Sequence, residues 1–257
     1  MGDEIACVQG GITDLIMSLE DAQKEDKVYI YSHFKQAKEL YAPFVKETEQ
    51  IYYDSINAAQ TLKFNFPHRF LPKRLHPNVS APKEAREYAE SMLDVWNPNK
   101  KKVIGVHPVG SRLSNQFWAQ FNQPLKYLPK NFLGKIMSDL DSIYLLFGAR
   151  EDLLNYASLA NGKNPRVFLI DEPIWHSLAF VEKCDLIIGV DSAIKGYSAI
   201  KNIPTICLVG DYEDPLRDEV FLLPYVKEGI MHVIKFRDLN EQLIEEVNFK
   251  CKDILTK

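Results

Sequence analysis

The stretch from Asp185 to Ala199 places the strongest constraint on the fold of this chain. Residues 185–190 form a short and almost wholly apolar run, as expected for a strand buried on both faces of a parallel sheet. The run stops at Asp191-Ser192, two residue types that commonly cap the start of a helix. A strand that leads directly into a capped helix brings polar side chains and free N–H groups to the carboxyl edge of the sheet. Open α/β proteins bind their ligands at that edge.

An Asp-Ser pair can also serve only to cap its helix. The second half of the chain, however, holds several strand ends that finish in polar or glycine-containing turns. Such a cluster favours a binding site over a lone helix cap.

Strand-like and helix-like segments alternate along the chain, which predicts an α/β fold with doubly wound parallel sheets. The predicted strands cover residues 4–9, 27–32, 50–53, 102–107, 142–147, 166–170, 185–190, 205–209 and 231–236. The predicted helices cover residues 15–22, 35–41, 83–96, 129–140, 174–183, 195–201 and 240–254, and a further helix follows residues 148–152 and ends near residue 160. A tight turn at residues 10–14 separates the first strand from the first helix.

Residues 62–82 interrupt this alternation. Prolines at positions 67, 72, 77 and 82 predict a segment without regular structure, and its interleaved aromatic residues favour an ordered loop over a disordered linker. The predicted helix at residues 83–96 follows this segment and ends at a turn formed by residues 97–100. We therefore expect two domains, an N-terminal domain of residues 1–97 and a C-terminal domain of residues 98–257.

The composition excludes several classes of function. Of 257 residues, 46% are apolar and 26% are charged, as in ordinary globular proteins. The formal net charge of −4 gives no electrostatic argument for nucleic acid as a partner. Two basic clusters, Lys73-Arg74 and residues 100–102, are interpreted as solvated loops.

The four cysteines have no metal-ligand spacing, so we expect reduced thiols and no metal site. Reduced thiols are typical of the cytoplasm. The N-terminus carries Asp3 and Glu4 and does not resemble a signal peptide. No apolar run approaches the length of a membrane span, so the expected membrane contact is at most peripheral.

Three strand ends of the second half carry chemistry that suits a phosphorylated ligand. Hydroxyls, cations and helix N-terminal amides favour phosphate oxygens, and a carboxylate can accept hydrogen bonds from ribose hydroxyls. The candidates are His107, Ser111, Arg112, Gly148, Glu151, Asp152, Asp191, Ser192 and Lys195. Together they describe a pocket for a nucleotide diphosphate. The alternatives are a core role for His107 and a solvated surface position for Arg112 and Lys195, while Trp118 and Trp175 are interpreted as packing residues.

These residues resemble the bacterial lipopolysaccharide heptosyltransferase family, glycosyltransferase family 9. The resemblance rests on residues 107–112 with Trp118, 147–149, 191–192, 197–199 and 203–205, and on 11–14 near the N-terminus. It implies the GT-B fold, in which two Rossmann-like domains face a cleft. The C-terminal domain of that fold holds a nucleotide-sugar donor, and the N-terminal domain holds the acceptor.

The resemblance also implies a mechanism and residue roles. The family transfers a sugar with inversion and without a metal, and no cofactor is expected beyond the nucleotide sugar itself. Asp14 corresponds to the proposed base. Asp191 and Ser192 would face the diphosphate, Ser111 would assist, and Glu151 or Asp152 would meet the ribose.

The sequence departs from the family pattern at several places. Ala193 and Gly196 stand where the family usually has glycine and histidine, and Gln116 is nearest to the place of a lysine that often precedes the tryptophan. Lys195 or Arg112 would then supply the missing charge. An N-terminal domain of about 97 residues is also short for this fold.

The resulting expectation is a cytoplasmic enzyme that transfers a sugar from a nucleotide diphosphate to a glycan or lipid-linked saccharide. The departures keep three alternatives open. These are a nucleotide-sugar-binding protein without catalysis, a nucleotide-sugar epimerase or hydrolase, and a purely structural interaction module.

Overall fold

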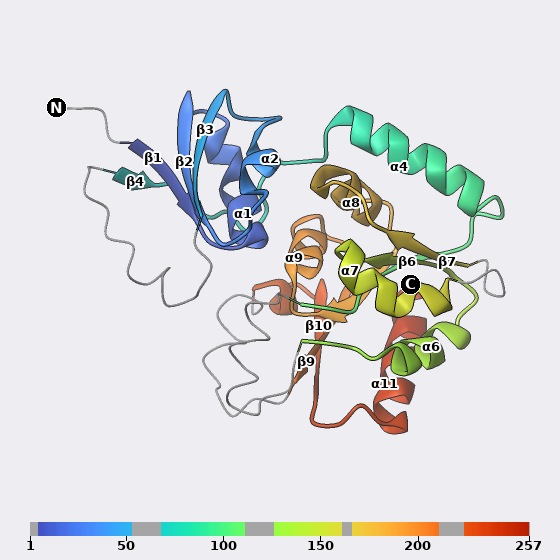
Figure 1. Ribbon diagram of the computed structural model, residues 1–257. Helices are drawn as coiled ribbons and strands as arrows, with labels where there is room; N and C mark the ends of the chain where they lie inside the picture. Colours follow the sequence, from blue (N-terminus) through green and yellow to red (C-terminus); the bar gives the residue numbers. More distant parts are fainter. Residues whose placement is uncertain (1–4, 53–67, 111–125, 161–165, 211–223, 257) are drawn as a thin grey trace. The chain divides into compact units, whose positions relative to one another are not determined.

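The computed structural model describes residues 5–52, 68–110, 126–160, 166–210 and 224–256 (Figure 1). The chain divides into two compact units, Met1–Pro82 and Lys83–Lys257. The helix at residues 83–96, which the sequence analysis assigned to the N-terminal domain, therefore belongs to the second unit. Ser111, Arg112, Gln116 and Trp118 lie outside the described residues.

The first unit is a parallel four-stranded sheet with the order β3-β2-β1-β4. Its elements are β1 (Ile5–Gln9), α1 (Ile12–Ala22), β2 (Lys27–Ser32), α2 (Ala37–Tyr41), β3 (Glu47–Tyr52) and β4 (His68–Phe70). Strands β2 and β4 flank β1, so the strand order reverses at β1. The carboxyl end of β1 is consequently a topological switch point, the place where open α/β sheets bind ligands.

Two expectations for this unit are corrected. Strand β4 lies within the proline-rich segment that was expected to lack regular structure, and it pairs with β1. A three-residue strand at a sheet edge has too little periodicity to be seen in a sequence. Helix α1 also begins at Ile12 rather than Leu15, so Asp14 lies in its first turn.

The second unit contains a parallel six-stranded sheet with the order β10-β9-β8-β5-β6-β7. Its strands are β5 (Val103–His107), β6 (Ile143–Phe147), β7 (Val167–Ile170), β8 (Leu186–Val190), β9 (Thr205–Gly210) and β10 (Met231–Phe236). Its helices are α4 (Lys83–Trp96), α6 (Lys130–Ser138), α7 (Arg150–Leu153), η1 (Leu154–Leu159), α8 (Ile174–Val181), α9 (Ala193–Ile200) and α11 (Glu241–Leu255). The helix expected to follow residues 148–152 and to end near residue 160 is instead a short α7 that begins at Arg150, followed by the 3-10 helix η1.

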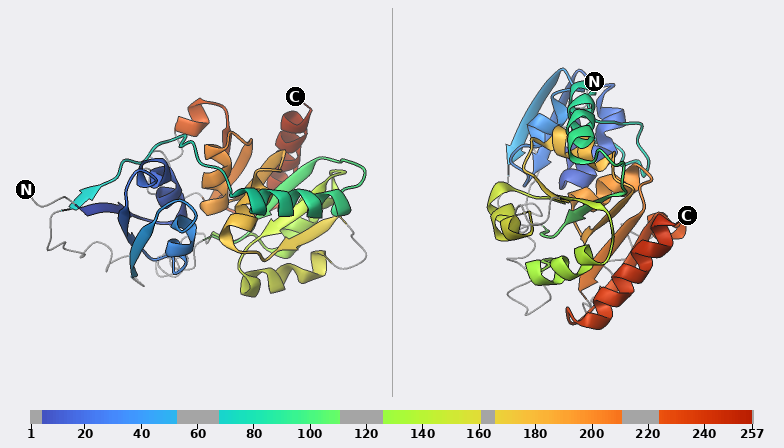
Figure 2. Two further views of the ribbon diagram at one scale, coloured as in Figure 1. Left: turned by 90° about the horizontal axis from the view of Figure 1, so that it is seen from above. Right: turned by 90° about the vertical axis from the view of Figure 1, so that its right-hand side faces the viewer.

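The strand order of the second sheet is that of a doubly wound Rossmann-like fold, with its switch point between β5 and β8. Alternate strand residues, such as Ile104, Leu146 and Ile188, form one hydrophobic core with α6 and α11. Figure 2 shows α11 running along the sheet. Helix α4 packs against α8, where Trp96 stacks on Phe180, and its ring also stacks on Phe168 of β7. Helices therefore cover both faces of the sheet, which is why its strands are apolar throughout.

Within the described part of the chain, no helix combines the length and hydrophobicity needed to cross a membrane. All four cysteines are free thiols in buried positions.

Candidate functional site

The expected base, Asp14, lies beside the switch point of the first sheet. As the third residue of α1, it accepts a hydrogen bond from the N–H of Gly11 to Oδ2 at 3.1 Å. Gly10 has φ +132°, and a Cβ at that position would lie 2.4 Å from the same oxygen. Only glycine therefore lets the backbone turn this close to the carboxylate.

The second oxygen of Asp14 faces a lysine that the sequence analysis did not select. Lys73 Nζ donates to Oδ1 at 2.7 Å, and the side chains of Asp14 and Lys73 are 25% and 41% exposed. Lys73 follows β4, the neighbour of β1, so the two residues meet although they are 59 positions apart.

The end of β2 completes this edge of the first sheet. Ser32 Oγ donates to the carbonyl of Gly10 at 2.7 Å and thereby holds the glycine turn. The ring of His33 lies beside Gly11. Burial lowers the pKa of His33, and the negative charge of Asp14 partly opposes that effect. A carboxylate, an imidazole and an ammonium group therefore gather at one edge, and a carboxylate in such a place can act as a general base.

In the second unit, Asp191 holds two lysines at the carboxyl end of β8. Lys195 Nζ lies 2.5 Å from Oδ1, and Lys126 Nζ contacts Oδ2. The lysine side chains are only 7% and 13% exposed, whereas that of Asp191 is 42% exposed. Burial would raise the pKa of Asp191, but the two ammonium groups hold it well below its usual range. Lys195 is thus not the solvated surface charge that one alternative described.

The backbone around Gly110 brings Lys126 to this position. Gly110 N donates to the carbonyl of Lys126 at 2.7 Å, and Leu128 N donates to the carbonyl of Pro108 at 2.8 Å. A Cβ on Gly110 would lie 2.6 Å from Lys126 Cβ and 3.1 Å from the carbonyl oxygen of Asp191. Residues 126–128 therefore pack directly on the residues that follow β5, and Lys126 lies beside Asp191.

Sequence reasoning missed Lys126 because it looked for a cation near Trp118. A single lysine before the predicted helix at residues 129–140 was the only available signal, and it is a weak one. The return of the chain onto Pro108 and Gly110 is a tertiary contact, which the local sequence does not reveal.

Ser192 is the N-cap of α9, as the sequence predicts, and its Oγ accepts from the N–H of Lys195 at 3.4 Å. The first N–H groups of a helix have no acceptor within it, so the start of α9 attracts anions. Asp191, the two lysines and this helix start lie together at the switch point.

His107 ends β5 and pairs in register with Gly189 of β8. Its Nδ1 is buried and has no hydrogen-bond partner among the residues that the structure describes. Burial lowers its pKa to about 4, so the imidazole is neutral at pH 7. A neutral imidazole can donate one hydrogen bond and accept another. The burial of Nδ1 agrees with the core role that one alternative gave to His107.

The third strand end places Gly148, Glu151 and Asp152 directly after β6, the neighbour of β5. Glu151 is exposed and Asp152 is partly buried, both within α7. They lie at the same carboxyl edge of the sheet as His107 and Asp191. Among the described residues, no group of three or more His, Cys, Asp or Glu side chains is arranged to hold a metal.

No protein-family model and no curated protein sequence matches this chain. Its fold is similar to that of ADP-heptose LPS heptosyltransferase II from E. coli, with a TM-score of 0.54 at 14% sequence identity. The similarity covers 95% of this chain and 80% of that one. A glycosyl transferase family 9 structure from Veillonella parvula DSM 2008 has a TM-score of 0.49 at 15% identity, over 93% of this chain and 71% of that one.

At this level of identity the similarity concerns the fold. The expected α/β fold with two Rossmann-like units is confirmed, and the chain has the GT-B-like fold of the E. coli heptosyltransferase.

Proposed function

We propose that this protein is a glycosyltransferase that moves a sugar from a nucleotide-diphosphate donor to a glycan or lipid-linked saccharide acceptor. The observation that carries the proposal is the pair of lysines, Lys126 and Lys195, held by Asp191 beside the start of α9. The similarity in fold to a heptosyltransferase whose description names ADP-heptose supports it. The free buried cysteines are in keeping with an enzyme of the cytoplasm.

The donor side needs positive charge where the diphosphate leaves. Two ammonium groups and the N–H groups at the start of α9 supply it without a metal ion. His107 and the carboxylates of Glu151 and Asp152 would meet the rest of the nucleotide, with the ribose hydroxyls donating to a carboxylate. Ser111, Arg112 and Gln116 remain proposed donor contacts.

The acceptor side needs one base. Asp14 would take the proton from the acceptor hydroxyl as that oxygen attacks the anomeric carbon of the sugar. The bond between this carbon and the diphosphate oxygen breaks on the opposite face, and the electron pair leaves with the diphosphate. Configuration is therefore inverted in a single displacement.

A thermal-shift screen against ADP, UDP, GDP, CMP and their sugar conjugates would identify the donor, because a ligand that binds the folded state raises its apparent stability. Transfer is then measured with candidate acceptors, with and without EDTA. We expect EDTA not to reduce the rate of transfer. The Asp14→Asn variant should not transfer sugar, but it should bind the donor as the wild type does.

The other outcomes separate the alternatives. Conversion of the donor without any acceptor would indicate an epimerase or hydrolase. Donor binding without turnover would indicate a binding protein. If no nucleotide shifts the melting temperature, the proposal fails.

A further inference from the structure

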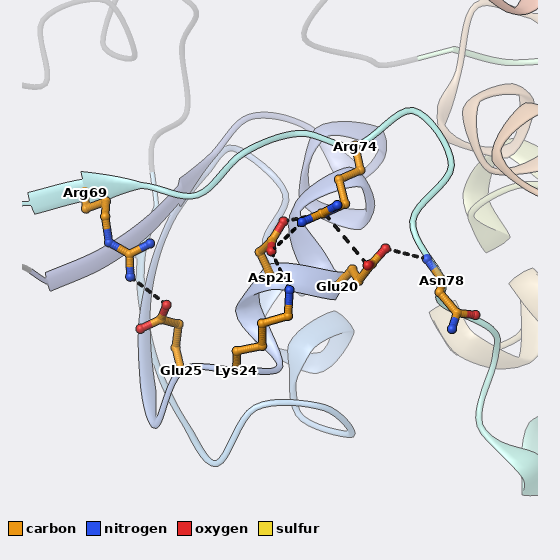
Figure 3. A network of polar contacts seen from close by, with 7 residues as sticks. All are labelled: Glu20, Asp21, Lys24, Glu25, Arg69, Arg74 and Asn78. Atoms are coloured by element: carbon orange, nitrogen blue, oxygen red, sulfur yellow. Dashed lines mark hydrogen bonds and ion pairs between the residues drawn. The ribbon is translucent and has the colours of Figure 1, made fainter.

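The segment 68–79, here called the basic strap, is fastened along α1 by charged contacts (Figure 3). It begins as β4, paired with β1, and continues past the end of that strand. Arg69 contacts Glu25 at 2.6 Å, and the N–H of Asn78 donates to Glu20 at 2.8 Å. The cluster Lys73-Arg74 was interpreted as a solvated loop, but both residues make specific ion pairs.

Arg74 makes the strongest contact between the basic strap and α1. Its Nε donates to Asp21 Oδ2 at 2.6 Å and its Nη2 donates to Oδ1 at 2.9 Å, so the pair is bidentate. Its backbone N–H also donates to the carbonyl of Met17 at 2.8 Å. The guanidinium of Arg74 and the ammonium of Lys24 hold the pKa of Asp21 well below its usual range. A planar, two-bond contact of this kind restricts orientation as well as distance.

This fastening fixes the residue immediately before Arg74. Lys73 reaches Asp14 from the strap, while Gly11 reaches the same carboxylate from the turn after β1. Each oxygen of Asp14 therefore has one anchor. A carboxylate offers about four lone-pair sites, so two anchors set the plane of the group and still leave sites for an acceptor proton.

We propose that Lys73 is the positioning residue of Asp14, and that the bidentate pair of Arg74 with Asp21 holds Lys73 there. The inference rests on the proposed role of Asp14 as the base. Lys73 acts through the carboxylate. It holds the group in the orientation that faces the acceptor hydroxyl, and misplacement of a reacting group by about 1 Å can cost about 100-fold in rate.

The test compares Lys73→Met, Lys73→Arg and Asp14→Asn, with Arg69→Met as the matched control. Arg69 lies on the same strap, but it pairs with Glu25, which follows the end of α1. We expect Lys73→Met to lower kcat about 10- to 100-fold and to leave KM for the donor within about twofold. Lys73→Arg should recover much of the loss, and Arg69→Met should match the wild type.

A second readout does not depend on turnover. In ¹⁵N–¹H spectra the Gly11 amide reports its hydrogen bond to Asp14, so Lys73→Met should shift this signal and Arg69→Met should not. An unchanged Gly11 signal in Lys73→Met, or an unchanged kcat, would overturn the positioning role. A raised KM with unchanged kcat would also overturn it.

The two readouts separate this inference from the proposed function. If Asp14→Asn transfers sugar at the wild-type rate, the assignment of the base fails whatever Lys73 does. If Asp14→Asn is inactive but Lys73→Met is normal in both readouts, only the positioning role fails.

Discussion

Lys195 Nζ lies 2.5 Å from Oδ1 of Asp191, the residue that directly follows β8 and stands four positions earlier in the chain. The lysine side chain is 7% exposed, so its charge is held at the edge of the sheet and cannot move freely in solvent. Lys126 contacts the other oxygen of the same carboxylate. One acid thus holds two cations, and the group as a whole carries a net positive charge.

Replacing Lys126 should weaken nucleotide binding. Hydrogen bonds to charged groups contribute about 1.5–3 kcal/mol, so Lys126→Met should raise the Kd for the nucleoside diphosphate about 10- to 100-fold. Isothermal titration calorimetry would measure the change. Lys130→Met, at an exposed lysine of α6, serves as the control and should bind as the wild type does. Equal affinities for the Lys126 and Lys130 variants would contradict the assignment.

Replacing Asp191 should cost stability, because Asp191→Asn leaves two lysines facing each other without a counter-charge. Removal of one partner from a buried pair costs about 3–5 kcal/mol, and the partial exposure of Asp191 reduces our expectation to about 2 kcal/mol. Urea denaturation would measure the free energy of unfolding of both proteins.

The same variant gives a pH dependence with a defined sign. The pKa of folded Asp191 lies below its ordinary value of 3.8, so its stabilisation is present above pH 3.8 and is lost as the pH falls below that value. The difference in stability between wild type and Asp191→Asn should therefore be constant from pH 5 to 7 and shrink toward pH 3. A difference that grows on acidification would be the wrong sign.

His107 should stay neutral across the physiological range. Burial lowers its pKa from 6.5 to about 4, so the unfolded chain binds a proton more readily than the folded one between these values. The wild type should lose stability as the pH falls from 6.5 to 4, and His107→Gln should lose less. The imidazole signals in NMR spectra should titrate near pH 4 in the folded protein. A midpoint near 6.5 would show that the ring is solvated.

Gly10→Ala should disturb both stability and the base. A residue at φ +132° is strained unless it is glycine, at a cost of about 1–3 kcal/mol, and the new Cβ would also displace the Asp14 carboxylate. Gly229→Ala is the matched control, since Gly229 also has positive φ but no atom of the described residues lies within 4 Å of a Cβ built there. We expect both variants to lose stability and only Gly10→Ala to lose transfer. Equal activities would show that Gly10 matters for the backbone alone.

Local patterns were enough to predict the strands β5 to β10 of the second unit. Strands β5 to β10 are apolar because helices cover both faces of their sheet, and this produces a signal in every short window. The cap at Ser192 and the position of Asp191 at a strand end are also local, so both were predicted. Gly10, Gly11 and Asp14 lie within five consecutive residues, so their place in the turn after the first strand was also predicted from the local sequence.

The partners of these residues were decided by the tertiary structure. Lys126 lies 65 positions from Asp191, and Lys73 lies 59 positions from Asp14. Each lysine sits in a segment without helix or strand periodicity, so its neighbours depend on how the chain returns to the sheet. The strand order produces the switch points beside β1 and β5. The residues of a strand do not reveal with which distant strand it pairs. The sequence by itself therefore determined the fold class and the acids, whereas only the folded sheets decided which cations those acids hold.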